Sequence, residues 1–398
     1  MFVSERIENI GVSPTMKVAA KAKEMKAEGL PIIDLSVGEP DFPTPRNIKD
    51  AAIKAIENNQ TGYTINAGTV ELRKVISEKL KRENNLDYGL NEIIVSSGAK
   101  QSLFNVMQTI LNKGDEVIIP APYWVSYPEM VAVAEGKSVI INTTEENRFL
   151  VTPEQLKAAI TPKTKAFILC NPSNPTGNAY TKQELEAIAE IALENNFYII
   201  SDEIYEKLTF DNFEFVSFPS LNPALKEKTI LVNGTSKAYS MTGWRIGYTA
   251  APENVVKGIN KIQSHSTSNA CSISQAAAVE ALSGSQEEVE KMRVQFEQRR
   301  NYLHKELSSI PEFSVVLPEG AFYLFPNVEK VFHHSTDVLK VESSFDFAMY
   351  LLYEAKLAVV PGSAFGAEGF LRLSYATSME NLVEAVERIK KAVAKLRD

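Results

Sequence analysis

One segment of the chain places a lysine and an arginine close together, directly after an apolar run. Residues 233–247 read Asn-Gly-Thr-Ser-Lys-Ala-Tyr-Ser-Met-Thr-Gly-Trp-Arg-Ile-Gly and follow the apolar residues 230–232. In a cleft at the end of a strand, Lys237 would lose solvation, which lowers the pKa of an amine and favours Schiff-base formation with an aldehyde. Arg245 adds a fixed cation suited to a phosphate. The pair predicts a site for pyridoxal phosphate, whereas a lysine taken alone is most often a solvated surface charge.

Polar residues also stand at the ends of other apolar runs, where ligands of open α/β sheets bind. Asp202 follows the run 198–201 and, if buried, needs a partner, either a protonated pyridine nitrogen or a cation in a structural salt bridge. Tyr205 would then be able to donate to a ring oxygen. The segment 171–177 reads Asn-Pro-Ser-Asn-Pro-Thr-Gly, a rigid turn in which Asn174 offers a directed amide. A tight connection between elements explains the prolines and the glycine but not both asparagines.

Three further segments are open to a binding interpretation and to a structural one. Residues 97–100 (Ser-Gly-Ala-Lys) join a strand to a helix that we expect to begin near Gln101. The small residues of this segment are consistent with anion binding by backbone N–H groups and equally with a tight turn. Trp124 would stack on a flat cofactor or pack in the core. Arg372 lies in the apolar run 370–374, where a substrate carboxylate or an internal Asp or Glu would satisfy it.

The elements that must position these residues alternate between short apolar runs and longer helical patterns. The runs that predict strands are 93–96, 116–119, 138–141, 166–170, 198–201, 229–232 and 246–249. Their apolar residues are continuous rather than alternating, which is typical of a mostly parallel sheet covered on both faces. Thr152 and Thr181 each open a capping box at the start of a helix. The pattern predicts an α/β doubly wound fold.

We expect a large α/β domain over residues 46–290 and a smaller α+β domain formed by residues 1–45 and 291–398. Within and next to the smaller domain we expect a charged helix over 289–307, strands near 313–317, 322–325 and 371–374, and a final helix whose apolar face is formed by Leu382, Val386, Ile389, Val393 and Leu396. The first 45 residues are rich in turns and are expected to pack against both domains.

The composition is that of an ordinary globular protein, with 44% hydrophobic and 23% charged residues in 398. A formal net charge of −8 argues against nucleic acid or an anionic membrane as a partner. Cys170 and Cys271 are the only cysteines, so neither a disulfide framework nor a metal site is predicted. The start lacks the features of a signal peptide, and no apolar run approaches the roughly 20 residues that span a bilayer. We expect a cytoplasmic protein.

These segments, taken together over essentially the whole chain, resemble the fold-type I pyridoxal-phosphate aminotransferases of class I, in particular the bacterial aspartate aminotransferases. The resemblance is carried by residues 35–42 (Leu-Ser-Val-Gly-Glu-Pro-Asp-Phe), 171–177, 233–247 and 372–376 (Arg-Leu-Ser-Tyr-Ala), in this order and spacing. It implies a large domain with a mostly parallel seven-stranded sheet, a smaller α+β domain, and pyridoxal 5'-phosphate as cofactor.

The resemblance also implies a role for each matching residue. Lys237 would carry the cofactor as a Schiff base, Asp202 would pair with the ring nitrogen, and Tyr205 and Asn174 would bind the ring oxygen. Trp124 would stack on the ring and, with Asn174, border the substrate. The residues implied to bind the cofactor phosphate are Gly98, Ala99, Lys100, Ser236, Arg245 and, from the neighbouring subunit of a homodimer with shared sites, Tyr63. Those implied to bind the substrate carboxylates are Gly38 and Arg372 for the α-carboxylate, and Lys100 and Thr15 for the distal one.

The implied reaction is reversible transfer of an amino group between L-aspartate and 2-oxoglutarate by ping-pong kinetics, with amino acids and keto acids as the small-molecule partners. Close relatives also transaminate prephenate, and many of these carry Lys-Pro-Ser ahead of the matching threonine, where residues 11–15 here read Gly-Val-Ser-Pro-Thr. Aromatic aminotransferases, and lyases or synthases on the same fold, are alternatives. A non-catalytic cofactor-binding regulator is a further one, which the acidic charge and the lack of an added N-terminal domain disfavour.

Overall fold

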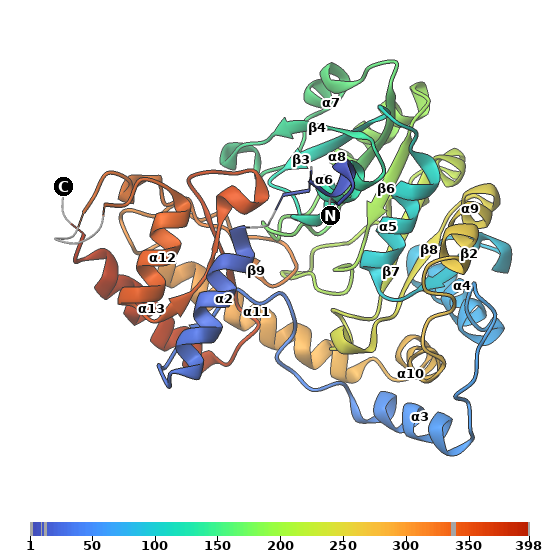
Figure 1. Cartoon of the computed structure of the whole chain (residues 1–398), viewed down its shortest axis with the longest axis horizontal. Helices are drawn as coiled ribbons and strands as arrows, with labels where there is room; N and C mark the ends of the chain where they lie inside the picture. Colours follow the sequence, from blue (N-terminus) through green and yellow to red (C-terminus); the bar gives the residue numbers. More distant parts are fainter. Residues whose placement is uncertain (1–2, 9, 12–13, 336–339, 397–398) are drawn as a thin grey trace.

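The computed structural model describes residues 3–8, 10–11, 14–335 and 340–396, and a seven-stranded sheet forms its centre (Figure 1). The strands lie in the order β2-β8-β7-β6-β5-β3-β4. Their bounds are β2 Ile93–Ser96, β3 Glu116–Ala121, β4 Lys137–Asn142, β5 Thr164–Cys170, β6 Tyr198–Asp202, β7 Thr229–Gly234 and β8 Gly247–Ala250. Only β8 runs against its neighbours within this sheet. The predicted α/β fold with a mostly parallel sheet of seven strands is confirmed.

Helices cover both faces of this sheet, which explains why its strands are apolar at consecutive positions. One face packs against α5 Ala99–Ile110, α6 Ser126–Val133 and α9 Glu253–Ser264. The other face packs against α7 Pro153–Ala159 and α8 Lys182–Glu194. Both predicted capping boxes are present: the side chains of Thr152 and Thr181 each accept from the backbone N–H three residues on, and their own backbone N–H groups donate to the side-chain oxygen of that residue. Helices α3 Arg46–Glu57, α4 Val70–Asn84 and α10 Ser272–Ser283 pack together at the β2 end.

The C-terminal part adds three helices and a small sheet, coloured orange to red in Figure 1. The helices are α11 Glu287–Leu307, α12 Ser344–Glu354 and α13 Met379–Val393. The strands β9 Tyr323–Leu324, β11 Val360–Pro361 and β12 Leu371–Ser374 form an antiparallel sheet in the order β11-β12-β9. The short 3-10 helices of the chain are η1 Leu90–Glu92, η2 Glu145–Asn147, η3 Phe218–Ser220, η4 Pro223–Lys228, η5 Thr242–Trp244, η6 Glu329–Val331 and η7 Gly362–Phe365.

Two expectations for this part were wrong in detail. The predicted strand near 313–317 is reduced to a single bridge between Ser314 and Asn327, because no neighbouring strand continues the pairing. Leu396 packs against the core as expected, but it lies beyond the end of α13 rather than on its apolar face.

The N-terminal segment is also more regular than predicted. It forms α1 Glu5–Glu8 and the 14-residue helix α2 Pro14–Ala27 rather than a run of turns. Val18, Ala22 and Met25 are buried on α2, a helical spacing that the turn-rich interpretation overlooked. Helix α2 packs against α12, α1 contacts α6, and β1 Ile33–Asp34 pairs in parallel with β10 Leu357–Ala358. Within the described residues, no helix has the length and apolar character needed to cross a membrane.

Candidate active site

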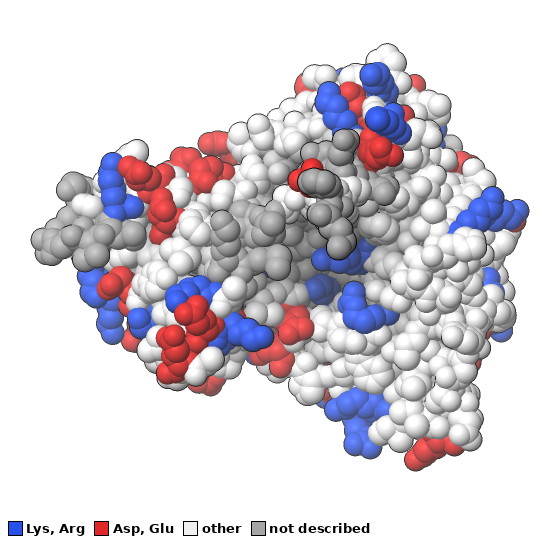
Figure 2. Space-filling model, viewed as in Figure 1, with Lys and Arg blue, Asp and Glu red and all other residues white. Residues whose placement is uncertain are grey.

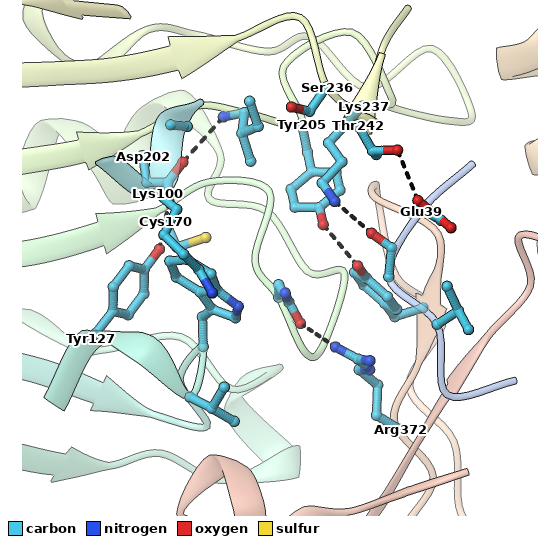
Figure 3. A pocket seen from close by; sticks show the side chains of 18 of the residues that line it. Glu39, Lys100, Tyr127, Cys170, Asp202, Tyr205, Ser236, Lys237, Thr242 and Arg372 are labelled. Carbon is cyan, nitrogen blue, oxygen red and sulfur yellow. Dashed lines mark hydrogen bonds between the residues drawn. The ribbon is translucent and has the colours of Figure 1, made fainter. Parts of the chain in front are cut away.

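A cavity of about 590 Å³ lies where strands of the large sheet end and meet the small sheet. The carboxyl ends of β5 and β6 lie side by side there, with Cys170 opposite Asp202 in the strand register. The C-terminal part contributes Arg372 from β12, and the segment before α3 contributes Gly38. The predicted site residues that line this one cavity are Gly38, Ala99, Lys100, Trp124, Asn174, Asp202, Tyr205, Ser236, Lys237, Arg245 and Arg372. Figure 3 shows most of their side chains converging on the same space.

Lys237 reaches into this cavity from the loop that follows β7. Its Nζ donates to the carbonyl oxygen of Gly38. Burial, helped by the nearby Arg372 and Arg245 cations and opposed by the Glu39 and Asp202 carboxylates, lowers the pKa of Lys237 to about 8. An amine with this pKa is partly uncharged near neutral pH, so Lys237 is available both as a nucleophile and as a base.

Asp202 is buried at the end of β6, and its carboxylate accepts two hydrogen bonds but pairs with no cation of the described chain. Its Oδ2 accepts from the Tyr127 hydroxyl at 2.7 Å, and its Oδ1 accepts from the Ile204 backbone N–H at 3.3 Å. Burial raises the pKa of Asp202, whereas the bond from Tyr127 acts in the opposite direction. Among the residues that the structure describes, no Lys or Arg forms an ion pair with Asp202, so the salt-bridge alternative is wrong there. The cavity side of the carboxylate fits a cationic nitrogen.

Arg372 is buried in β12 without an acidic partner in the described part of the chain. Its Nη1 donates to Asn174 Oδ1 at 3.0 Å and its Nη2 to the Ser36 carbonyl at 2.7 Å, while Nε has no hydrogen-bond partner among the described residues. Burial lowers the pKa of this guanidinium. The alternative of an internal Asp or Glu is therefore not realised among these residues, and a carboxylate entering the cavity would complete the pairing of Arg372.

A phosphate fits the start of α5. Gly98 caps this helix with φ +90°, and a Cβ there would lie 2.2 Å from Nη2 of Arg245. Helix α5 begins at Ala99, slightly before the position predicted, so its first backbone N–H groups lie beside the cavity. Arg245 donates to the Thr242 carbonyl at 2.7 Å and has no ion pair among the described residues. A helix N-terminus beside an unpaired arginine is a favourable site for an anion.

Lys100 stands on the same turn and faces an aromatic ring. Its Nζ lies 4.8 Å from the centre of the Trp124 ring. Burial, and to a lesser degree the Arg245 cation, lowers the pKa of Lys100. In the space-filling view, basic side chains lie where the surface is hollowed between the two halves of the molecule (Figure 2). A ligand with more than one negative charge would suit this hollow.

Two predicted residues do not line the cavity. Gly98 adjoins the lining residue Ala99 without lining the cavity itself, and Tyr63 is 96% exposed on the surface. Thr15 lies in α2, and its side chain is outside the described part of the structure, so its predicted role stays a prediction.

The lining residues that were not predicted from the sequence include Tyr127, Cys170, Tyr323 and Glu39. Tyr127 lies in the first turn of α6, three residues after Trp124, and the centres of the two rings are 5.3 Å apart in an edge-to-face contact. Cys170 directly precedes the predicted segment 171–177. Tyr323 is the one residue with a polar tip in the apolar run 322–325, and its Oη lies 2.8 Å from that of Tyr205. Glu39 accepts from Thr242 at 2.7 Å.

Known proteins with the same sequence pattern carry aminotransferase names. The family model for aminotransferases of class I and II matches residues 31–389. An aspartate aminotransferase of Bacillus sp. strain YM-2 is 51% identical over 98% of this chain and 99% of its own length. A probable aspartate/prephenate aminotransferase of Rickettsia bellii is 51% identical over 99% of this chain and 100% of its own length.

The fold leads to the same group of proteins. The crystal structure of the aspartate aminotransferase from Rhizobium meliloti superposes with a TM-score of 0.97 at 46% identity, covering 100% of both chains. The resemblance predicted from residues 35–42, 171–177, 233–247 and 372–376 is thus confirmed across the full length. The chain belongs to the aminotransferase class I and II family.

Proposed function

We propose that this protein is an aspartate aminotransferase that uses pyridoxal 5'-phosphate to transfer the amino group reversibly between L-aspartate and 2-oxoglutarate. Relatives about half identical over their whole length bear the name aspartate aminotransferase, which supports the substrate pair. The observation that carries the proposal is the buried Arg372, which has a free Nε and no acidic partner among the described residues, in the same cavity as the partly neutral Lys237. A carboxylate acceptor and a reactive amine are what an amino-acid substrate requires.

The residues around the cavity fit the cofactor. Lys237 would hold its aldehyde carbon, Asp202 its ring nitrogen, and Tyr205 and Asn174 its ring oxygen, with Trp124 against the ring. Its phosphate would be bound by Gly98, Ala99, Lys100, Ser236 and Arg245. The uncompensated charges support this assignment, because a zwitterionic ligand supplies a cation beside Asp202 and an anion beside the N-terminus of α5.

The chain's own residues then divide the chemistry among them. When bound, pyridoxal phosphate supplies an electron-accepting ring that stabilises negative charge at the α-carbon of the amino acid. Lys237, displaced by the incoming amine, would take the proton from the α-carbon, and its lowered pKa keeps it partly unprotonated for this purpose. Asp202 would keep the ring nitrogen protonated. Arg372 would fix the α-carboxylate and so orient the α-carbon toward Lys237.

Lys100 supports a substrate with a second carboxylate. Its Nζ lies beside Trp124 at the edge of the cavity and has no ion pair among the described residues, so a distal carboxylate would pair with it. We propose the same distal role for Thr15 on the basis of family resemblance. Gly38, whose carbonyl accepts from Lys237, would contribute its backbone to binding of the α-carboxylate.

A second candidate function is transamination of prephenate. The Rickettsia relatives named probable aspartate/prephenate aminotransferase are as similar to this chain as the aspartate aminotransferases are. The two functions share the cavity described above and differ in the amino acceptor.

One assay separates the candidates. Purified protein loaded with pyridoxal phosphate is tested with a panel of acidic, aromatic and apolar amino acids against 2-oxoglutarate, and with aspartate against prephenate. The proposal expects the highest kcat/KM for aspartate with 2-oxoglutarate. Higher kcat/KM for an aromatic donor, or formation of a product other than the matching keto acid, would contradict it.

We further propose a homodimer with shared sites. Tyr63 is almost fully exposed in the single chain and is followed by the exposed Ile65, an arrangement suited to contact with a second copy. In the dimer, Tyr63 would reach the phosphate bound by the neighbouring subunit.

A further inference from the structure

Tyr323 joins the two halves of the cavity. Its Oη lies 2.8 Å from Oη of Tyr205, which comes from the loop after β6 in the large sheet. The centre of its ring lies 4.5 Å from the guanidinium carbon of Arg372, which lies over the ring and comes from the neighbouring strand β12. Both tyrosines are buried. No other side chain in the described structure has a hydrogen bond with Tyr205 and a ring contact with Arg372.

We propose that Tyr323 is a positioning residue with two separable roles: its hydroxyl directs the proton of Tyr205 into the cavity, and its ring supports the guanidinium that binds the substrate carboxylate. This inference rests on the proposed function, because it assigns the cavity side of Tyr205 to the cofactor ring oxygen.

The hydroxyl role follows from counting donors. Tyr205 and Tyr323 share one hydrogen bond, and either hydroxyl can donate it. If Tyr205 donates to a ligand in the cavity, its single proton is committed, so Tyr323 must donate to the oxygen of Tyr205. A hydroxyl that accepts one hydrogen bond becomes a stronger donor in the next. Tyr323 would therefore strengthen the bond from Tyr205 to the ring oxygen.

The ring role follows from the packing around Arg372. The guanidinium carbon lies 4.5 Å from the centre of the Tyr323 ring and 5.1 Å from the centre of the Phe365 ring. Gly38 lies close to the Tyr323 hydroxyl, since a Cβ added to Gly38 would be 3.0 Å from it. A cation stacked on an aromatic face is stabilised without using its hydrogen-bond donors. Nε of Arg372 thus stays free for a ligand.

The first test removes only the hydroxyl. With pyridoxal phosphate bound and no substrate present, the absorbance of the link to Lys237 changes when its nitrogen loses a proton. The negatively charged ring oxygen of the cofactor helps to hold the proton on this nitrogen. A hydrogen-bond donor to that oxygen weakens this attraction, so losing part of the donation raises the apparent pKa of the nitrogen. Tyr323→Phe should raise this apparent pKa by about 0.5 to 1, and Tyr205→Phe should raise it by more.

The double variant shows whether Tyr323 acts through Tyr205. In Tyr205→Phe/Tyr323→Phe, the apparent pKa should equal that of Tyr205→Phe alone, because the bond between the two hydroxyls is already lost. Tyr350→Phe is the matched control, since Tyr350 is also buried and its hydroxyl donates to a carbonyl, that of Ala392, at 2.8 Å outside the cavity. This control should titrate like the parent protein.

The second test removes the ring. Tyr323→Leu should weaken binding of the non-reactive dicarboxylate maleate by about 3- to 30-fold, whereas Tyr323→Phe should leave its dissociation constant within about twofold of the parent. The two substitutions together separate the hydroxyl role from the ring role.

Each outcome bears on the proposal. An unchanged apparent pKa in Tyr323→Phe, or additive shifts in the double variant, would overturn the hydroxyl role while leaving the proposed function intact. Unchanged maleate binding in Tyr323→Leu would overturn the ring role. A parent protein that binds no pyridoxal phosphate would overturn both this inference and the proposed function. Shifts that are non-additive in the double variant, together with a loss of maleate affinity only in Tyr323→Leu, would support the whole inference.

Discussion

At the scale of single residues, the cavity is defined by charges that the described protein leaves uncompensated. Asp202 and Arg372 are buried and have no ion-pair partner among the residues that the structure describes, and Lys237 has a pKa lowered to about 8. Burying an unpaired charge is costly, and a folded protein tolerates it where a ligand restores the balance. Because the charges have both signs and lie around one space, the ligand must itself carry both signs.

Asp202 gives the sharpest test of this view. Asp202→Ala should yield a folded protein that still binds pyridoxal phosphate, because the link to Lys237 and the phosphate site remain. Its kcat should fall by at least about 100-fold, since the lost charge partner stabilises the ring nitrogen most as negative charge develops on the ring. Steady-state kinetics, with a thermal melt to confirm folding, measure this. A kcat within a few-fold of the parent would rule out the pairing.

Lys100 tests the substrate assignment. Lys100→Ala should lower kcat/KM for aspartate. The loss, expressed as transition-state free energy, should be about 2–3 kcal/mol, which is the cost of losing a desolvated charge pair. An apolar or aromatic donor has no distal carboxylate and serves as the internal control, so its kcat/KM should fall less. Equal losses for all donors would instead assign Lys100 to the cofactor phosphate or to the fold.

The sequence pointed to the buried ionised residues Asp202 and Arg372 and missed the two tyrosines Tyr127 and Tyr323. Asp202 and Arg372 stand out because ionised groups next to or inside apolar runs demand a partner. Tyr127 and Tyr323 do not, because a tyrosine in an apolar segment is equally consistent with the core. Their roles depend on hydroxyl contacts with Asp202 and Tyr205, which belong to distant segments.

At the scale of elements, all seven strands of the large sheet coincide with predicted runs. Strands buried on both faces carry a strong local signal, because consecutive positions are apolar. The short strands of the small sheet are set by pairing between distant segments, so the run 313–317 did not become one. Helix α2 was missed because its apolar positions Val18, Ala22 and Met25 are few and pack on α12, which is far along the chain.

The start of α5 offers a test at this scale. Gly98→Ala should raise the dissociation constant of pyridoxal phosphate by about tenfold or more, because the added Cβ would displace the Arg245 guanidinium. Gly114→Ala is the matched control: Gly114 has a similar φ of +85°, and a Cβ there meets nothing within 4 Å. The control should lose about 1 kcal/mol of stability and keep its cofactor affinity. Equilibrium dialysis of the apoproteins compares the two, and equal affinities would contradict the assignment of the phosphate site.

At the scale of the whole molecule, the cavity collects residues from segments that are far apart in the sequence. Gly38 precedes α3, Asp202 ends β6, and Arg372 lies in β12 near the C-terminus. A site assembled in this way depends on how the two halves of the chain pack. Through the exposed Tyr63, the site would also depend on how a second copy of the chain packs against the first.

Mixing two defective chains tests the shared site. Lys237→Ala removes the reactive amine, and Tyr63→Phe removes a hydroxyl that the neighbouring site would use. After refolding an equal mixture, roughly a quarter of the sites should combine an intact Lys237 with an intact Tyr63, and these should show the parental cofactor affinity. Light scattering should give the mass of a dimer. A monomer with full activity, or a mixture without restored sites, would exclude shared sites.

Mapping the lysine that reacts with pyridoxal phosphate is the most direct test of whether Lys237 holds the cofactor in this cavity. Protein incubated with pyridoxal phosphate is reduced with borohydride, digested and mapped by mass spectrometry. Because Lys237 is the lysine with a pKa lowered to about 8 between Asp202 and Arg372, the pyridoxyl group should be found on Lys237. Lys237→Ala should lose the adduct, whereas Lys100→Ala should retain it. A pyridoxyl group on any other lysine, or no stable adduct in the parent protein, would contradict the account.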